Sequence, residues 1–161
     1  MKKLGNVFIL GDSYSTFEGA IDKDCWLWYY KEPRNDTDVC KAEQTWWIRL
    51  LNNTDSNLVC NSSYSGTTIC HTGYDNADWS EKFSFSARLR NLVNSGYFEE
   101  NHFDTFIIFG GTNDSWANSP LGEIKYGVKT EKELFSVKPA YCYLIETVKA
   151  SCPDAKIVTI I

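Results

Sequence analysis

The feature that most constrains the fold of this chain is an apolar run that stops at a polar corner. Residues 7–10 (Val-Phe-Ile-Leu) are all apolar, and Gly11-Asp12-Ser13 follows them directly. A short apolar run bounded by a turn signal is typical of a strand buried on both faces, and Gly11 permits a sharp turn where a side chain would clash. Ser13 is therefore expected just past the carboxyl end of the first strand, where open α/β sheets place their chemistry. Taken alone, the corner fits equally well a serine that caps a helix beginning near Tyr14.

Two later segments repeat this arrangement. Residues 58–60 (Leu-Val-Cys) lead into a polar tip, residues 61–68, which includes Gly66. Residues 105–109 form a third apolar run, and Gly110-Gly111-Thr112-Asn113-Asp114 follows it. Because the carboxyl ends of parallel strands lie at one edge of a sheet, a single fold brings all three polar tips together there.

Helical patterns lie between these strands. They predict helices over residues 45–51, 83–93 and 130–152, and Pro139 is expected to kink or split the last one. A fourth strand is expected over residues 157–161. Strands that alternate with helices predict a parallel sheet with helices on both faces.

The longest irregular stretch, about residues 16–42, contains an aromatic cluster at residues 26–30 (Trp-Leu-Trp-Tyr-Tyr). One interpretation is a surface insertion whose aromatic rings cover the edge of the sheet. The other is a substrate wall beside Ser13, because connections near strand ends commonly carry recognition. The sequence favours neither.

Composition limits the partners. A chain of 161 residues is long enough for one domain with a core, and its net charge of -5 leaves no basic surface for nucleic acid or an anionic membrane. No segment has the length of a membrane span. The apolar run near the first residue is interrupted by Gly5 and Asn6 and meets Asp12 too soon for a signal peptide, so a cytoplasmic location is expected.

The 6 cysteines show neither a Cys-x-x-Cys pair nor zinc-ligand spacing, so no metal site is expected. Cys60 in a predicted strand and Cys142 in a predicted helix favour small buried thiols. The sequence neither requires nor excludes a disulfide.

The three polar tips resemble the sequence blocks of the SGNH hydrolases, the GDSL-type lipase, esterase and acylhydrolase family. Gly11-Asp12-Ser13 matches the first block, Gly66 the second and Gly111-Thr112-Asn113-Asp114 the third, in the family's order and over nearly the whole chain. The resemblance implies a three-layer α/β/α sandwich with a parallel, flavodoxin-like sheet, here without the family's C-terminal strand and helix. It implies no cofactor and no metal.

The resemblance also implies a serine esterase that hydrolyses carboxylic esters, including acetyl or other acyl groups on carbohydrate, through an acyl-enzyme on Ser13. The oxyanion hole would be made by the backbone N–H groups of Ser13 and Gly66 and by the side-chain amide of Asn113. We further expect Asp12 and Trp116 to contact the substrate, which would be a small-molecule or carbohydrate ester.

The catalytic base is the difficulty. The family supplies it from an Asp-x-x-His block near the C-terminus, whereas this chain ends at Ile161 and contains only His71 and His102. His102 precedes the third strand and belongs at the opposite edge of the sheet. His71 lies after the Gly66 tip, but no Asp-x-x-His pattern surrounds it, so a structural role is favoured. The expectation is a single SGNH-like domain over residues 1–161, C-terminally incomplete, with its catalytic Asp and His beyond Ile161 and little or no activity of its own.

Two alternatives belong to other classes. A non-catalytic binding domain on the same scaffold would retain Ser13, Gly66 and Asn113 as a pocket for an anion or a carbonyl group. A nucleotide- or flavin-binding domain is disfavoured, because the chain has neither Gly-x-Gly-x-x-Gly nor a Walker lysine. Finally, the apolar, β-branched residues 157–161 would form an uncovered edge strand, for which we expect self-association.

Overall fold

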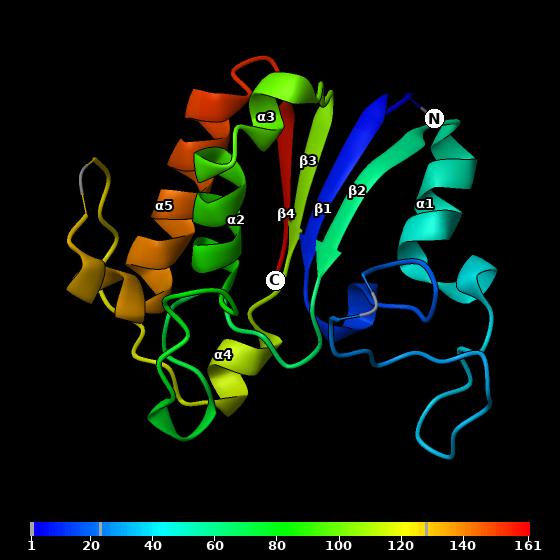
Figure 1. Cartoon of the computed structure of the whole chain (residues 1–161), viewed down its shortest axis with the longest axis horizontal. Coiled ribbons are helices and arrows are strands. Elements are labelled where there is room, and N and C mark those ends of the chain that lie inside the picture. Colours follow the sequence, from blue (N-terminus) through cyan, green and yellow to red (C-terminus); the bar gives the residue numbers. More distant parts are fainter. Residues whose placement is uncertain (1, 23, 128) are drawn as a thin grey trace.

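The computed structural model describes residues 2–22, 24–127 and 129–161. In this part of the chain four parallel strands form one sheet in the order β2-β1-β3-β4, with helices on both of its faces (Figure 1). This is the predicted α/β/α sandwich with the strand order of a flavodoxin-like sheet. The strands are β1 (Asn6–Gly11), β2 (Asn57–Ser63), β3 (Thr105–Phe109) and β4 (Lys156–Ile160).

Strand β1 lies inside the sheet, between β2 and β3. Its four apolar residues, Val7, Phe8, Ile9 and Leu10, are each 0% exposed, which confirms that this strand is buried on both faces. Alternate residues point in opposite directions along a strand, so Phe8 and Leu10 pack in one core and Val7 and Ile9 in the other. In the first core the ring of Phe8 stacks on Phe106 of β3, with the ring centroids 4.4 Å apart.

Helix α1 (Trp46–Thr54) covers one face of the sheet, and helices α2 (Phe85–Asn94), α3 (Tyr97–Glu100) and α5 (Val137–Ser151) cover the other (Figure 1). Trp47 and Leu51 of α1 pack on Val7 and Ile9. The remaining helical turns are η1 (Ser13–Ser15), η2 (Ala42–Gln44), η3 (Tyr74–Asn76), η4 (Glu131–Phe135) and the short helix α4 (Thr112–Trp116).

The predicted helix over residues 130–152 is divided, although the division is not at Pro139. Ser136 has extended backbone angles (φ -119°, ψ 145°) and separates η4 from α5. Pro139 is the third residue of α5, in the first turn, where backbone N–H groups have no partner within the helix. The proline is therefore accommodated without breaking the helix.

Helices α3 and α4 were not predicted from the sequence. Both are a few residues long, too short to show a helical period of apolar residues. Each follows a glycine with positive φ, 74° at Gly96 and 119° at Gly111. The glycine sets the direction of the chain before the helix starts.

Strand β4 lies at the end of the described sheet, next to β3. Val158 is 39% exposed and Ile161 is 89% exposed, so the apolar character of this segment is only partly buried. Among the described residues, no helix combines the length and the apolar composition needed to cross a membrane.

Candidate active site

The register of the sheet brings the three polar tips to one edge. Gly11, the last residue of β1, pairs with Ser63 at the end of β2 and with Phe109 at the end of β3. The backbone N–H of Tyr64 donates to Gly11 O (3.2 Å). The ring of Tyr14 stacks on Phe109, with the centroids 6.5 Å apart. The segments that carry Ser13, Gly66 and Asn113 therefore leave the sheet side by side.

Ser13 opens the single turn η1 directly after β1. Its side chain is partly exposed, and its carbonyl accepts hydrogen bonds from the backbone N–H (3.1 Å) and the hydroxyl (2.7 Å) of Thr16. The turn requires glycine at position 11, because a Cβ there would lie 2.6 Å from Ser15 Oγ and 2.6 Å from Ser63 Oγ. The backbone around Ser13 is thus fixed by close packing at Gly11 before it and by the hydrogen bonds from Thr16 after it.

Asp12 is completely buried, with 0% of its surface exposed. Its Oδ1 accepts a hydrogen bond from the Tyr14 N–H (3.2 Å), and among the described residues its Oδ2 has no partner. Burial raises the pKa of this carboxyl to about 6, against the lowering effect of the Tyr14 N–H. We predicted contact with substrate for Asp12; its burial assigns it instead to holding the turn that presents Ser13.

Gly66 follows β2 in a turn closed by a hydrogen bond from the Thr67 N–H to Tyr64 O (3.4 Å). Its φ is 79°, and no heavy atom lies within 4 Å of the position that a Cβ would take. Among the described residues no acceptor is bonded to the Gly66 N–H. The Gly66 N–H is therefore left without an acceptor in the described part of the chain, and the space beside its Cα is empty.

Asn113 lies in α4 directly after β3 and is 3% exposed. Its Nδ2 donates to the backbone carbonyl of Thr67 (3.0 Å), and its Oδ1 accepts from the hydroxyl of Tyr74 (2.8 Å). A carbonyl oxygen can only accept, so the contact with Thr67 determines which end of the amide carries nitrogen. The second N–H of Nδ2 is left to donate to another group.

The neighbouring Asp114 fixes the loop that follows Gly66. Its carboxylate accepts hydrogen bonds from the backbone N–H groups of Ile69 (2.8 Å) and Cys70 (3.2 Å). Burial raises the pKa of Asp114, and the two backbone N–H groups act in the opposite direction. Asn113 and Asp114 together clamp this loop onto the end of β3.

Arg88 on α2 forms hydrogen bonds to the carboxyl ends of β1 and β2 and to the loop that follows β2. Its guanidinium donates to Gly11 O (3.0 Å), to Thr67 Oγ1 (3.1 Å) and to the carbonyl of Ser62. Desolvation lowers the pKa of Arg88 to about 10, so it stays charged at neutral pH. The sequence reasoning missed Arg88 and Tyr74; the only available signal for Arg88 was a charged residue within an amphipathic helix.

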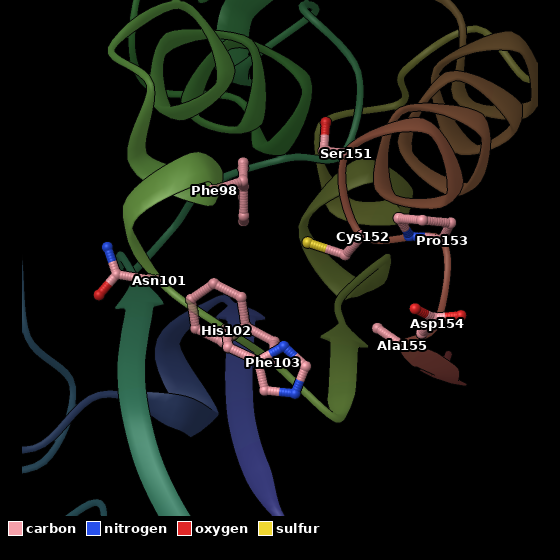
Figure 2. A pocket seen from close by; sticks show the side chains of 9 residues that line it. All are labelled: Phe98, Asn101, His102, Phe103, Ser151, Cys152, Pro153, Asp154 and Ala155. Atoms are coloured by element: carbon pink, nitrogen blue, oxygen red, sulfur yellow. The ribbon is translucent and has the colours of Figure 1, made fainter.

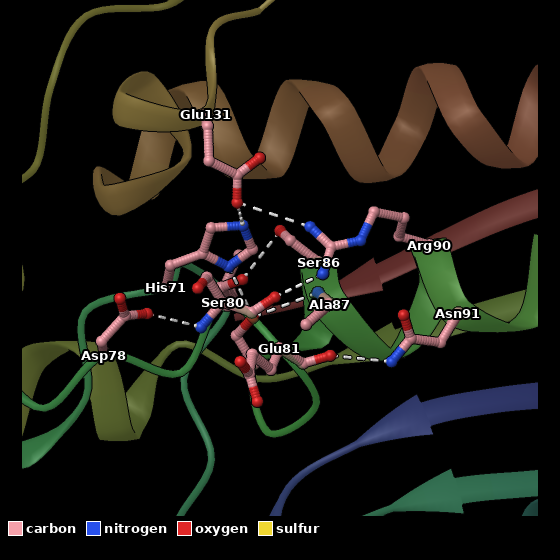
Figure 3. A network of polar contacts seen from close by, with 11 residues as sticks. His71, Asp78, Ser80, Glu81, Ser86, Ala87, Arg90, Asn91 and Glu131 are labelled. Atoms are coloured by element: carbon pink, nitrogen blue, oxygen red, sulfur yellow. Dashed lines mark hydrogen bonds and ion pairs between the residues drawn. The ribbon is translucent and has the colours of Figure 1, made fainter.

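Neither histidine can serve Ser13 as a base. His71 is 0% exposed; its Nδ1 is 2.8 Å from Ser84 Oγ and its Nε2 is 3.3 Å from Glu131 Oε1 (Figure 3). Burial lowers the pKa of His71, so the neutral imidazole is favoured. His102 is exposed, lies before β3 and contacts Asp104 (3.3 Å), at the opposite edge of the sheet.

Two cavities differ in their relation to this site. One of about 290 Å³ borders Asp114 and is mostly apolar; it is lined by Ile69, Gly111, Asp114, Ser115, Ser119, Leu121, Val137, Tyr141 and Ile161. The other, of about 110 Å³, lies at the amino-terminal edge around Phe98, His102 and Cys152 (Figure 2), away from Ser13. Trp116, expected to contact substrate, lies at the end of α4 and is 66% exposed.

Comparison with known proteins identifies the family and the fold. The chain matches the family GDSL-like Lipase/Acylhydrolase over residues 5–161. It is 40% identical to a protein of Bacteroides ovatus named as a GDSL-like lipase (TM-score 0.85, covering 98% of this chain and 72% of that one). It is 42% identical to a protein of the same description from Bacteroides uniformis (TM-score 0.86, 98% and 70%).

A more distant likeness concerns the fold alone. A family two carbohydrate esterase of Clostridium thermocellum, solved with cellohexaose, is 18% identical, with a TM-score of 0.57 over 99% of this chain and 43% of that one. No curated protein sequence matches the chain. The family match over nearly all of the chain and the strand-end positions of Ser13, Gly66 and Asn113 lead to one conclusion: this chain belongs to the GDSL-like lipase/acylhydrolase family and has the fold of an SGNH ester hydrolase.

Proposed function

We propose that the protein hydrolyses carboxylic esters, among them acyl groups carried by carbohydrate, through an acyl-enzyme on Ser13. The observation that carries this proposal is the Asn113 amide. It is held at both ends, by Thr67 O and by the Tyr74 hydroxyl, so that one N–H remains for a third partner. Preorganised donors of this kind stabilise the charge that develops on a carbonyl oxygen during acyl transfer.

In the proposed reaction Ser13 Oγ attacks the ester carbonyl carbon, and the proton of its hydroxyl passes to a base. The negative oxygen of the tetrahedral intermediate is bound by Asn113 Nδ2 and by the N–H groups of Gly66 and Ser13. The carbon–oxygen bond to the alcohol then breaks, and the alcohol leaves with a proton. Water hydrolyses the acyl-serine in the same manner and releases the acid. Each such donor contributes about 10²–10³-fold to the rate.

The base must be a group other than the two histidines, because the nitrogens of His71 face Ser84 and Glu131 and His102 lies at the far edge. A serine at its free pKa is a poor nucleophile. Imidazole added to the solution can accept this proton. An experiment with imidazole therefore tests whether the site is arranged for acyl transfer, even when the chain itself supplies no base.

Reaction with a fluorophosphonate tests the proposal. We expect the 161-residue chain to react slowly alone and faster with imidazole, with the adduct on Ser13 by peptide mass mapping. Ser13→Ala should abolish the adduct, and Asn113→Ala should slow its formation by about 10²-fold. Label on Ser15, Ser63 or Ser65 with Ser13 unmodified contradicts the assignment.

A second function, a non-catalytic carbonyl- or anion-binding domain, is favoured by the position of both histidines away from Ser13. It predicts that acylated sugars bind, whereas Ser13 does not react with the fluorophosphonate even when imidazole is present. The labelling experiment therefore distinguishes the two functions.

A further inference from the structure

Five aromatic side chains form a continuous row at the surface. Trp26 stacks on Phe83 (ring centroids 6.3 Å apart, interplanar angle 18°), and Tyr64 contacts both, at 5.5 Å from Trp26 and 5.6 Å from Phe83. Trp79 continues the row, 6.1 Å from Phe83 and 6.2 Å from Tyr74. We call these residues, Trp26, Tyr64, Phe83, Trp79 and Tyr74, the aromatic row.

The aromatic row leads into the candidate active site at both ends. At one end the backbone N–H of Ser65, next to Gly66, donates to Trp26 O (2.9 Å). At the other end the Tyr74 hydroxyl bonds the amide of Asn113 (2.8 Å). Both ends of the row are therefore joined by hydrogen bonds to the segments that carry Gly66 and Asn113.

The row has one exposed ring, Trp26, and a polar border, and its other four rings are partly buried. Trp26 is 64% exposed, so one face of its indole lies against Phe83 while much of the ring meets solvent. A cavity of about 240 Å³ beside the row is lined by Asp78, Trp79, Ser80, Glu81, Lys82 and Phe83, a mixture of aromatic and charged groups. Lys82 Nζ lies 4.9 Å from the centre of the Phe83 ring.

We propose that the aromatic row is a subsite for carbohydrate, the alcohol part of the ester, with a sugar ring stacked on Trp26. A pyranose ring has an apolar face of C–H groups and a rim of hydroxyls. The exposed indole matches the face, and the neighbouring carboxylates, hydroxyl and ammonium can hydrogen-bond the rim. This deepens the proposed function, since it names where the carbohydrate of an acylated substrate binds.

An acyl chain fits the aromatic row poorly. Apolar chains bind because they leave water, and the open, charged border of the row removes little water from a chain. The mostly apolar cavity of about 290 Å³ that includes Ile69, Leu121 and Val137 suits an acyl group better. In this proposal the aromatic row binds the alcohol part of the ester and the apolar cavity binds the acyl part.

The test measures binding of unacylated oligosaccharides to the 161-residue chain by titration calorimetry, with cellohexaose, xylohexaose and mannohexaose as probes. We expect at least one to bind with a millimolar or lower Kd. Trp26→Ala should raise that Kd by about tenfold or more, and Trp26→Phe should restore part of the affinity. Tyr126→Ala, at a tyrosine that is 69% exposed and outside the row, is the matched control and should bind as the unmodified chain does.

Three outcomes overturn the proposal: no probe binds, Trp26→Ala binds as tightly as the unmodified chain, or Tyr126→Ala weakens binding as much as Trp26→Ala. Fluorophosphonate labelling of Ser13 is measured on the same variants. It should be the same for the unmodified chain and for Tyr126→Ala, whose side chain lies outside the aromatic row. If Ser13 is not labelled in the unmodified chain although an oligosaccharide binds, the ester hydrolase is contradicted and the carbohydrate subsite stands. If Ser13 is labelled although no oligosaccharide binds, the subsite is contradicted and the ester hydrolase stands.

Discussion

The hydroxyl of Tyr74 donates a hydrogen bond to Oδ1 of Asn113 at 2.8 Å. Asn113 is 3% exposed, so water does not replace this donor. Together with the bond from Nδ2 to Thr67 O, it holds the amide so that the second Nδ2–H is left for the proposed oxyanion. It also polarises the amide, which strengthens Nδ2–H as a donor. Tyr74 is a positioning residue in this arrangement, because its hydroxyl acts through Asn113.

Tyr74→Phe keeps the ring and removes the hydroxyl, so Asn113 Oδ1 loses its partner. We expect the rate of fluorophosphonate labelling at Ser13 in imidazole to fall by about tenfold, less than for loss of the whole amide. Carbohydrate affinity should change little, because the ring remains. Tyr126→Phe is the control. An unchanged labelling rate in Tyr74→Phe would show that the amide is held without the phenol.

Gly66→Ala should damage the site beyond its effect on stability. At φ 79° an L side chain is strained, at a cost of roughly 1–2 kcal/mol in the free energy of unfolding. The new methyl group would also stand in the open space from which substrate approaches the Gly66 N–H.

Gly127→Ala is a matched control for this variant, since Gly127 has φ 77° and likewise no heavy atom within 4 Å of a Cβ. Urea unfolding should show similar losses of stability for the two variants. Only Gly66→Ala should slow the labelling of Ser13. Equal labelling rates would remove Gly66 from the oxyanion hole.

The buried Asp12 should make stability depend on pH. Burial raises its folded-state pKa from 3.8 to about 6. The folded protein therefore favours the protonated carboxyl, and this contribution is fully present below pH 3.8 and is lost as the pH rises through about 6. The difference corresponds to about 3 kcal/mol at 1.36 kcal/mol per pKa unit.

Asp12→Asn stays neutral at every pH and can still accept the Tyr14 N–H. Its free energy of unfolding, relative to that of the unmodified chain, should rise by up to this amount between pH 4 and pH 7, as measured in urea. Parallel stability curves for the two proteins over this range would mean that Asp12 titrates normally.

Strand β4 should support self-association of the chain. It lies at the end of the described sheet, and Val158 is 39% exposed on it. An open strand edge with apolar side chains is a template for pairing with another chain. We expect light scattering to show a dimer or larger species at micromolar concentrations, and Val158→Lys to shift the equilibrium toward monomer. A clean monomer for the unmodified chain would refute the prediction.

The layout of the sheet could be predicted from short apolar runs. Residues 7–10 and 105–109 have the length and composition typical of strands buried on both faces, and the glycine-rich corners mark where these strands end. Because parallel strands share an edge, strand-end position was enough to group the three polar tips, and the family resemblance then singled out Ser13, Gly66 and Asn113 within them. The short helices α3 and α4 were missed, because so few residues carry no periodic signal.

The hydrogen-bond partners of the candidate site residues were decided by the tertiary structure. Tyr74 lies 39 residues before Asn113, and Arg88 lies 77 residues after the Gly11 carbonyl that it binds. The burial of Asp12 and the turning of His71 toward Ser84 and Glu131 likewise depend on segments that meet only in the folded chain. Local sequence patterns determine strands and corners because they act through neighbouring residues. Hydrogen-bond orientation and burial are set by groups that are distant in sequence, and only the packed structure brings them together.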